Sequence, residues 1–176
     1  MNKKLVLIIA AAAILALIAA VFYMKRGWVP VVQSPQVAVL YTDAKKMEES
    51  GDLVSARAAY QKLISDFSNS REVMDWQKRF EDLNIRLLFS SVITPKSIEY
   101  EIKPGDSLDK IAREYQTTAE LIMKSNNLSS ENIFPGKKIK DWNATFSIVV
   151  YKSKNTLILK SSEEVFKVYT VATGLN

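Results

Sequence analysis

The hydrophobic pattern divides the chain into stretches of different period. Residues 5–24 are an uninterrupted apolar run, close to the roughly 20 residues that a helix needs to cross a bilayer. Apolar positions recur at helical spacing over 37–70 and 73–89, and they alternate with polar positions at 98–103. Three later runs have the length and composition of strands, and they lie at 146–151, 156–160 and 165–172. The pattern predicts an α+β chain of several domains.

The first run predicts a transmembrane signal anchor over residues 1–26, held in the inner membrane by 5–24. A cleaved signal peptide is the alternative, but its apolar region usually has ~7–15 residues and ends at a small-x-small site. The run here is longer and closes with Val21-Phe22-Tyr23-Met24, which favours an anchor. Residues 27–36, which contain two prolines, are predicted to be a linker. The remainder is expected in the periplasm or cell-wall space.

The charge distribution argues against nucleic acid as a partner. The net charge is +5, but Lys3, Lys4, Lys25 and Arg26 account for four of the 24 basic residues. The rest of the chain therefore has 20 basic residues and all 19 acidic ones, because no Asp or Glu precedes Asp43. Binding to phosphates requires a basic surface, and this nearly neutral composition does not predict one.

The segment 97–141 carries the signals of a small β-α-α-β unit. Pro104-Gly105 ends the alternating stretch, and Asp106 follows at the position of a helix N-cap, whose side chain accepts an unpaired backbone N–H. Pro135-Gly136 makes a second break, before a returning strand predicted at 137–140. Two short helices between the breaks are indicated by apolar residues at helical spacing, namely Leu108, Ile111, Ala112, Leu121 and Ile122.

This segment resembles a LysM domain at both ends. The opening motif is matched by Tyr100-x-Ile102-x-Pro104-Gly105-Asp106-Ser107-Leu108, and the closing motif by Asn126-x-Leu128, Ile133, Pro135-Gly136 and Ile139. The resemblance implies that the module binds polymers of N-acetylglucosamine, either peptidoglycan or chitin, in a shallow groove between two loops. The implied glycan-binding residues are Gly105, Asp106, Ser107, Leu108, Asn132, Ile133, Pro135 and Gly136.

Some of these residues have a purely structural alternative. Asp106 suits a helix cap, and Gly105 and Gly136 suit turns, without any contact to a ligand. One residue can do both, so the backbone of the two loops is the preferred candidate for contact with the glycan.

Residues 37–90 resemble a single tetratricopeptide repeat followed by one more helix. Ala44, Gly51, Ala56 and Tyr60 stand at the small, turn, small and aromatic positions of the repeat. One interpretation is a self-contained three-helix unit, in which the helix over 73–89 covers the repeat and its Trp76 and Phe80 are core residues. The other is a repeat that binds a protein partner or associates with itself.

Residues 145–176 resemble the first strands of the L,D-transpeptidase catalytic domain, and Thr173-Gly174 follows the third strand. The resemblance implies a Cys nucleophile activated by a His, but the 176 residues contain no Cys and no His. These residues therefore cannot perform that reaction, and the sequence predicts no catalytic residue, metal ligand or cofactor. One hypothesis is that the reading frame is truncated, so that the rest of such a catalytic domain is missing after residue 176.

Two functions follow. The first is membrane-anchored binding of peptidoglycan by the N-terminal portion of a cell-wall L,D-transpeptidase that cross-links the polymer. The alternative is a non-catalytic wall-binding scaffold whose helical repeat recruits a partner protein.

Overall fold

The computed structural model describes residues 35–142, 144–172 and 174. The anchor predicted at 5–24 lies outside these residues. Within the described part, no helix is both long and apolar enough to cross a membrane. The longest, α4 (Val73–Leu88), has 16 residues and an amphipathic pattern, and spans only about 24 Å. The predicted fold class is corrected on this point: the described residues are α+β, with helices and two antiparallel sheets.

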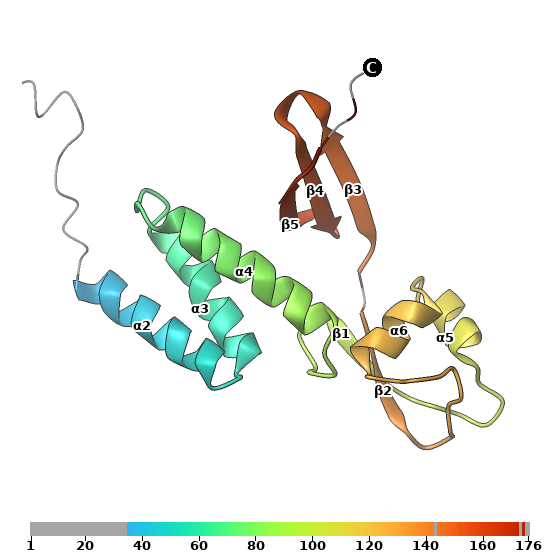
Figure 1. Cartoon of the computed structure of the whole chain (residues 1–176). Coiled ribbons are helices and arrows are strands. Elements are labelled where there is room, and N and C mark those ends of the chain that lie inside the picture. Colours follow the sequence, from blue (N-terminus) through green and yellow to red (C-terminus); the bar gives the residue numbers. More distant parts are fainter. Residues whose placement is uncertain (1–34, 143, 173, 175–176) are drawn as a thin grey trace, which may run out of the picture. The chain divides into compact units, whose positions relative to one another are not determined.

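Three antiparallel helices form a helical unit, α2 (Pro35–Glu49), α3 (Leu53–Asp66) and α4 (Figure 1). Pro35 begins α2, because proline lacks only an N–H that the first helical position leaves unpaired; Pro35 and Gln36, predicted as linker, thus belong to the helix. The turn into α3 uses Gly51 at φ +85°. Asp52 then caps α3 by accepting the Ser55 N–H at 3.1 Å.

The helical unit has its own apolar core. Trp76 and Phe80 lie in it, as the three-helix interpretation predicted. Small residues at Ala44 and Ala56 are fully buried, which lets α2 and α3 pack closely. The buried members of this core are Val37, Ala44, Ala56, Tyr60, Leu63, Trp76, Phe80 and Leu83.

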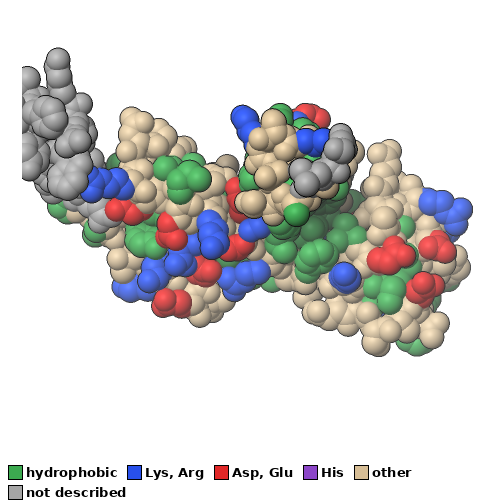
Figure 2. All heavy atoms as spheres, turned by 45° about the horizontal axis from the view of Figure 1, so that its top comes forward, with side chains coloured by type: hydrophobic (Ala, Val, Ile, Leu, Met, Phe, Trp, Pro, Cys, Tyr) green, Lys and Arg blue, Asp and Glu red, His purple; other side chains and the backbone are tan. Residues whose placement is uncertain are grey.

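Glu48 links the three helices through its carboxylate. Its Oε2 accepts the Tyr60 hydroxyl at 3.1 Å and Arg79 Nη1 at 3.2 Å, and its Oε1 accepts Arg86 Nη1 at 3.0 Å. Basic and acidic side chains are interspersed over these helices (Figure 2). The face shown in Figure 2 therefore carries charges of both signs, consistent with the nearly neutral composition.

The module at 97–142 has the order β1 (Ser97–Glu101), α5 (Leu108–Glu114), α6 (Ala119–Ser125) and β2 (Lys138–Trp142). The strands pair antiparallel, with Tyr100 opposite Ile139. Strand β2 runs two residues beyond the predicted end, because Asp141 and Trp142 pair with Ile98 and Ser97. The buried core consists of Tyr100, Ile102, Leu108, Ile111, Ala112, Ala119, Ile122 and Ile139.

Asn126, just after α6, joins that helix to strand β2. Its Oδ1 accepts the Lys140 N–H at 2.7 Å, and its Nδ2 donates to the Lys140 carbonyl at 2.7 Å and to the Ile122 carbonyl at 2.7 Å. The amide therefore pairs with Lys140 as a neighbouring strand would. This contact fixes the position of α6 on the sheet, because one side chain satisfies both backbone groups of a strand residue.

Lys140 also connects the module to the end of α4. Its side chain is 2% exposed, and Nζ donates to the carbonyls of Leu87 at 2.6 Å and Ser90 at 2.8 Å. The same ammonium lies 5.1 Å from the centre of the Trp142 ring. A cation at a helix C-terminus interacts favourably with the unpaired carbonyls there. Ser125 Oγ donates to the next carbonyl, that of Leu88, at 2.7 Å.

The last three strands, β3 (Phe146–Tyr151), β4 (Thr156–Ser161) and β5 (Glu164–Thr170), form an antiparallel meander (Figure 1). Ser162 and Glu163 both have positive φ, as in the two-residue turns that suit tight hairpins. A register shift beside Leu159 leaves Phe166 as an extra residue. Phe166 is buried edge-to-face against Trp142 at 5.9 Å and Phe146 at 5.5 Å between ring centres.

We predict that Asn126→Ala lowers the free energy of unfolding by about 2 kcal/mol, since it leaves the Lys140 N–H and carbonyl without partners in a partly buried site. Urea unfolding followed by circular dichroism measures the change. Asn127→Gly is the matched control: Asn127 is exposed and has φ +52°, a conformation that glycine accepts. Equal stability of the two variants would contradict the role given to Asn126.

Candidate functional site

Two glycine turns lie at the same end of the module. In the turn between β1 and α5, the Asp106 N–H donates to the Lys103 carbonyl at 3.2 Å and Gly105 has φ +85°. In the turn before β2, the Lys137 N–H donates to the Phe134 carbonyl at 3.3 Å and Gly136 has φ +81°. A Cβ at either glycine would meet open space, so the left-handed backbone, and not crowding, is what requires glycine.

Ile102 joins the two turns. Its carbonyl accepts the Gly136 N–H at 2.8 Å, and its N–H donates to the Lys137 carbonyl at 2.9 Å. These bonds continue the pairing of β1 with β2 past Glu101 and Lys138. The loops 105–108 and 132–136, predicted to flank a groove, are therefore held beside each other by backbone hydrogen bonds.

The Asp106 carboxylate is engaged within the module. Oδ2 accepts the Tyr100 hydroxyl at 2.7 Å and the Lys103 N–H at 2.8 Å, and Oδ1 lies 3.2 Å from Lys110 Nζ. The side chain is only 4% exposed. The hydrogen bond from Tyr100 is the main cause that lowers the pKa of Asp106 to about 2, and the same bond raises the pKa of Tyr100 to about 12.

The prediction that Asp106 caps the helix was wrong. Helix α5 begins at Leu108, and its N-cap is Ser107, whose side chain accepts the Lys110 N–H at 3.2 Å. Ser107 has the extended backbone typical of a cap. Asp106 instead accepts bonds from β1 and the turn after it, so it holds the strand-to-helix loop in shape.

The other predicted site residues divide by exposure. Leu108 is 2% exposed and packs in the core, so its side chain supports the loop 105–108 from inside the module. Ile133 is half-buried and packs against the same core. The exposed members, which present backbone and short side chains to solvent, are Gly105, Ser107, Asn132, Pro135 and Gly136.

Phe134 was missed by the sequence analysis. Its ring is 61% exposed and lies in the loop 132–136, with Lys137 Nζ 5.5 Å from the ring centre. A large exposed aromatic ring offers a flat apolar face to a ligand. Phe134 directly precedes Pro135-Gly136 and belongs to no strand or helix period. This position in the sequence could have indicated that the ring is exposed in a turn.

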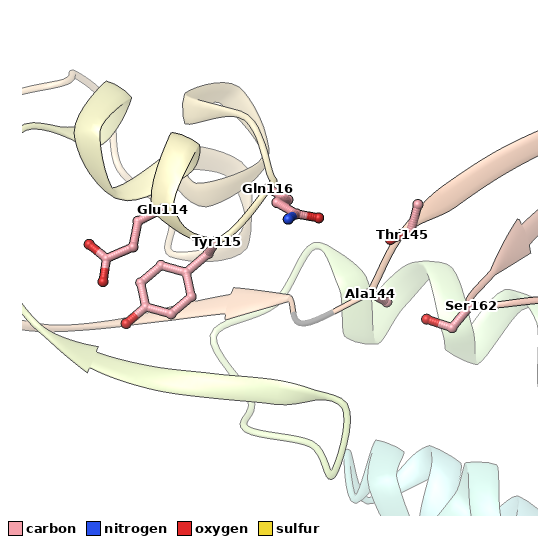
Figure 3. A pocket seen from close by; sticks show the side chains of 6 residues that line it. All are labelled: Glu114, Tyr115, Gln116, Ala144, Thr145 and Ser162. Carbon is pink, nitrogen blue, oxygen red and sulfur yellow. The ribbon is translucent and has the colours of Figure 1, made fainter.

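A separate cavity of about 310 Å³ lies at the other end of α5. Figure 3 shows Glu114, Tyr115 and Gln116 on one wall and Ala144, Thr145 and Ser162 on the other. The Ser162 N–H donates to the Thr145 carbonyl at 2.8 Å and fixes the second wall. The described residues contain no group of three or more His, Cys, Asp or Glu side chains that could hold a metal ion.

The Asp106 contacts predict a specific pH dependence. Because the folded-state pKa lies below the ordinary value of 3.8, the stability that Asp106 contributes is present above about pH 4 and is lost as the pH falls towards 2. We expect Asp106→Asn to melt below the unsubstituted chain at pH 7, and this difference to shrink between pH 4 and 2. Melting temperatures measured across this range test it. The exposed neighbour Asp109→Asn is the control, and a pH-independent difference for Asp106→Asn would refute the assignment.

The comparisons with known proteins agree with this geometry. The LysM domain family matches residues 100–140. The cell wall-binding protein YocH of Bacillus subtilis is 36% identical over 74 residues, which cover 40% of this chain and 26% of that protein. The N-acetylmuramoyl-L-alanine amidases sle1 of Staphylococcus saprophyticus and Staphylococcus epidermidis are each 51% identical over 41 residues, or 23% of this chain.

The matched part is a small share of these relatives, because the chain spans 26% of YocH and 12% to 13% of the two amidases. No solved structure matches the chain. The tetratricopeptide and L,D-transpeptidase resemblances gain no support from these matches. What they establish is that residues 100–140 are a LysM domain.

Proposed function

We propose that this chain binds peptidoglycan through the groove between loops 105–108 and 132–136 of its LysM domain. The observation that carries the proposal is the LysM match at residues 100–140, together with the two glycine turns that Ile102 joins. The relative YocH is named as a cell wall-binding protein and sle1 as an N-acetylmuramoyl-L-alanine amidase, and these names support a wall polymer as the ligand. The place of action is then the cell-wall space.

The groove suits a neutral sugar chain. Exposed backbone groups of the two turns donate and accept hydrogen bonds, and Ser107 and Asn132 add short polar side chains. Phe134 and Pro135 provide the apolar face against which the ring of a sugar packs. Asp106 contributes to glycan binding indirectly, by holding the loop in shape. Its carboxylate already accepts hydrogen bonds from Tyr100, Lys103 and Lys110.

Two kinds of protein are candidates for the one to which this LysM domain belongs: an L,D-transpeptidase and a non-catalytic scaffold. The order of a LysM domain followed by the β3–β4–β5 meander favours the N-terminal part of an L,D-transpeptidase. That reaction requires a Cys and a His, which these 176 residues lack. The alternative is a scaffold whose tetratricopeptide-like helices recruit a partner. Sequencing of the gene beyond codon 176 separates the two: a Ser-x-Gly-Cys motif with an upstream His supports the enzyme, and its absence supports the scaffold.

We predict that Phe134→Ala weakens binding five- to tenfold, equivalent to about 1 to 1.4 kcal/mol. Sedimentation with purified peptidoglycan and calorimetric titration with chitotetraose, a soluble N-acetylglucosamine oligomer, measure the affinity. Phe89→Ala is a close control, because Phe89 is also an exposed ring with a lysine Nζ at 5.5 Å. If the unsubstituted chain does not bind the polymer, the function is refuted; if Phe89→Ala and Phe134→Ala bind alike, the groove is misplaced.

A further inference from the structure

A second cavity, of about 250 Å³, lies away from the LysM groove. It is bordered by α3, the last turn of α4, residues 94–96 and Trp142 of β2. Its volume is just below the range of about 300–1,000 Å³ that is usual for ligand pockets, so it suits a small ligand. Its walls are largely apolar, and the side chains that make them so are Val54, Ala58, Leu87, Pro95 and Trp142.

Two charged residues, Arg57 and Lys96, line this cavity, and the guanidinium of Arg57 is held in place by its neighbours. Its Nε donates to Asn84 Oδ1 at 2.5 Å, and its Cζ lies 4.5 Å from the centre of the Phe80 ring. Asn84 is itself buried and donates from Nδ2 to the Phe166 carbonyl at 2.8 Å. The guanidinium is therefore oriented before any ligand arrives, which reduces the entropic cost of binding.

In the described part of the chain, Arg57 has no carboxylate at contact distance, although the charge of Glu164 acts on it from farther away. Among the ion pairs of the described residues, none within 4.0 Å includes it. A half-buried cation beside apolar walls is costly unless a counter-charge reaches it. The two terminal nitrogens of a guanidinium form a fork that matches the two oxygens of a carboxylate.

The neighbouring charges add to this preference for an anion. Lys96 lines the cavity and pairs with Glu164, whose side chain is 67% exposed and can be displaced. The Lys140 ammonium lies behind the wall, 5.1 Å from the ring centre of Trp142. Two cations, Arg57 and Lys96, thus line the cavity, and the exposed carboxylate of Glu164 acts on both.

We propose that this cavity binds the C-terminal carboxylate of a short peptide with small side chains, with Arg57 as the anchor. This proposal rests on the proposed function, because peptidoglycan would supply the ligand. Its glycan strands carry short peptides with free carboxylates. Alanine-sized side chains fit the small apolar space beside Trp142. Weak binding of a peptide here and of the glycan at the LysM groove would reinforce each other, since the second contact becomes intramolecular.

The test uses the full chain and the probe N-acetyl-D-alanyl-D-alanine, with its C-terminal amide as the uncharged counterpart, in calorimetric titrations. We expect the acid to bind at least tenfold more tightly than the amide. Arg57→Met should weaken binding of the acid at least tenfold, and Arg57→Lys, which keeps the charge but not the fork, about threefold. Arg71→Met, at an exposed arginine outside the cavity, is the control. Equal binding of acid and amide, or no effect of Arg57→Met, overturns the proposal.

A second variant covers the case in which Arg57→Met unfolds the chain. Ala58 is exposed and lines the cavity, so Ala58→Phe should fill it while leaving every charge in place. We expect this variant to lose binding of the acid probe with an unchanged melting temperature. Unaltered affinity in Ala58→Phe would show that the probe binds elsewhere.

Chitotetraose separates this inference from the proposed function. Arg57→Met and Ala58→Phe should bind chitotetraose like the unsubstituted chain. If chitotetraose and peptidoglycan bind but the dipeptide acid does not, only the cavity proposal fails. If the dipeptide acid binds but chitotetraose does not, the groove function fails and the cavity remains a carboxylate site.

Discussion

The buried ammonium of Lys140 is the contact on which the arrangement of the described residues most depends. Its hydrogen bonds to the Leu87 and Ser90 carbonyls close the C-terminal end of α4. An unpaired ammonium at 2% exposure would be strongly unfavourable. The carbonyls, with the Trp142 ring above them, replace the water that the ammonium loses. These bonds join the helical unit to the LysM domain, and the hydrogen bond from Ser125 to the Leu88 carbonyl adds to them.

Strand β2 makes this connection possible because both of its faces are buried. Ile139 packs into the LysM core, while Lys140 and Trp142 turn to the opposite side, towards α4 and Phe166. A module of about 45 residues buries little apolar surface by itself. The second buried face extends the LysM core into its neighbours, and the same face provides Trp142 as a wall of the Arg57 cavity.

Much of this fold was predictable from period and turn chemistry. The alternation at 98–103, the two Pro-Gly breaks and the apolar runs after 145 mark elements that the structure places within a few residues. The candidate site was harder to predict from the sequence. A side chain has several possible partners, and only the folded structure shows which of them it contacts. Asp106 and Ser107 are both good caps by residue type, and the hydroxyl of Tyr100 decides between them. Leu108 and Phe134 are both apolar, and only packing shows that one is core and the other surface. The partners of Lys140 lie about 50 residues away in sequence, beyond the reach of any local pattern.

The amide of Asn126 has a chemical consequence over time. Asparagine is among the thermolabile residues, and hydrolysis of its side-chain amide to a carboxylate removes both Nδ2 donors. The new oxygen would face the carbonyls of Ile122 and Lys140, which now accept from Nδ2. Three acceptors would then crowd one site between α6 and β2. Deamidation of Asn126 would therefore weaken the attachment of α6 to β2.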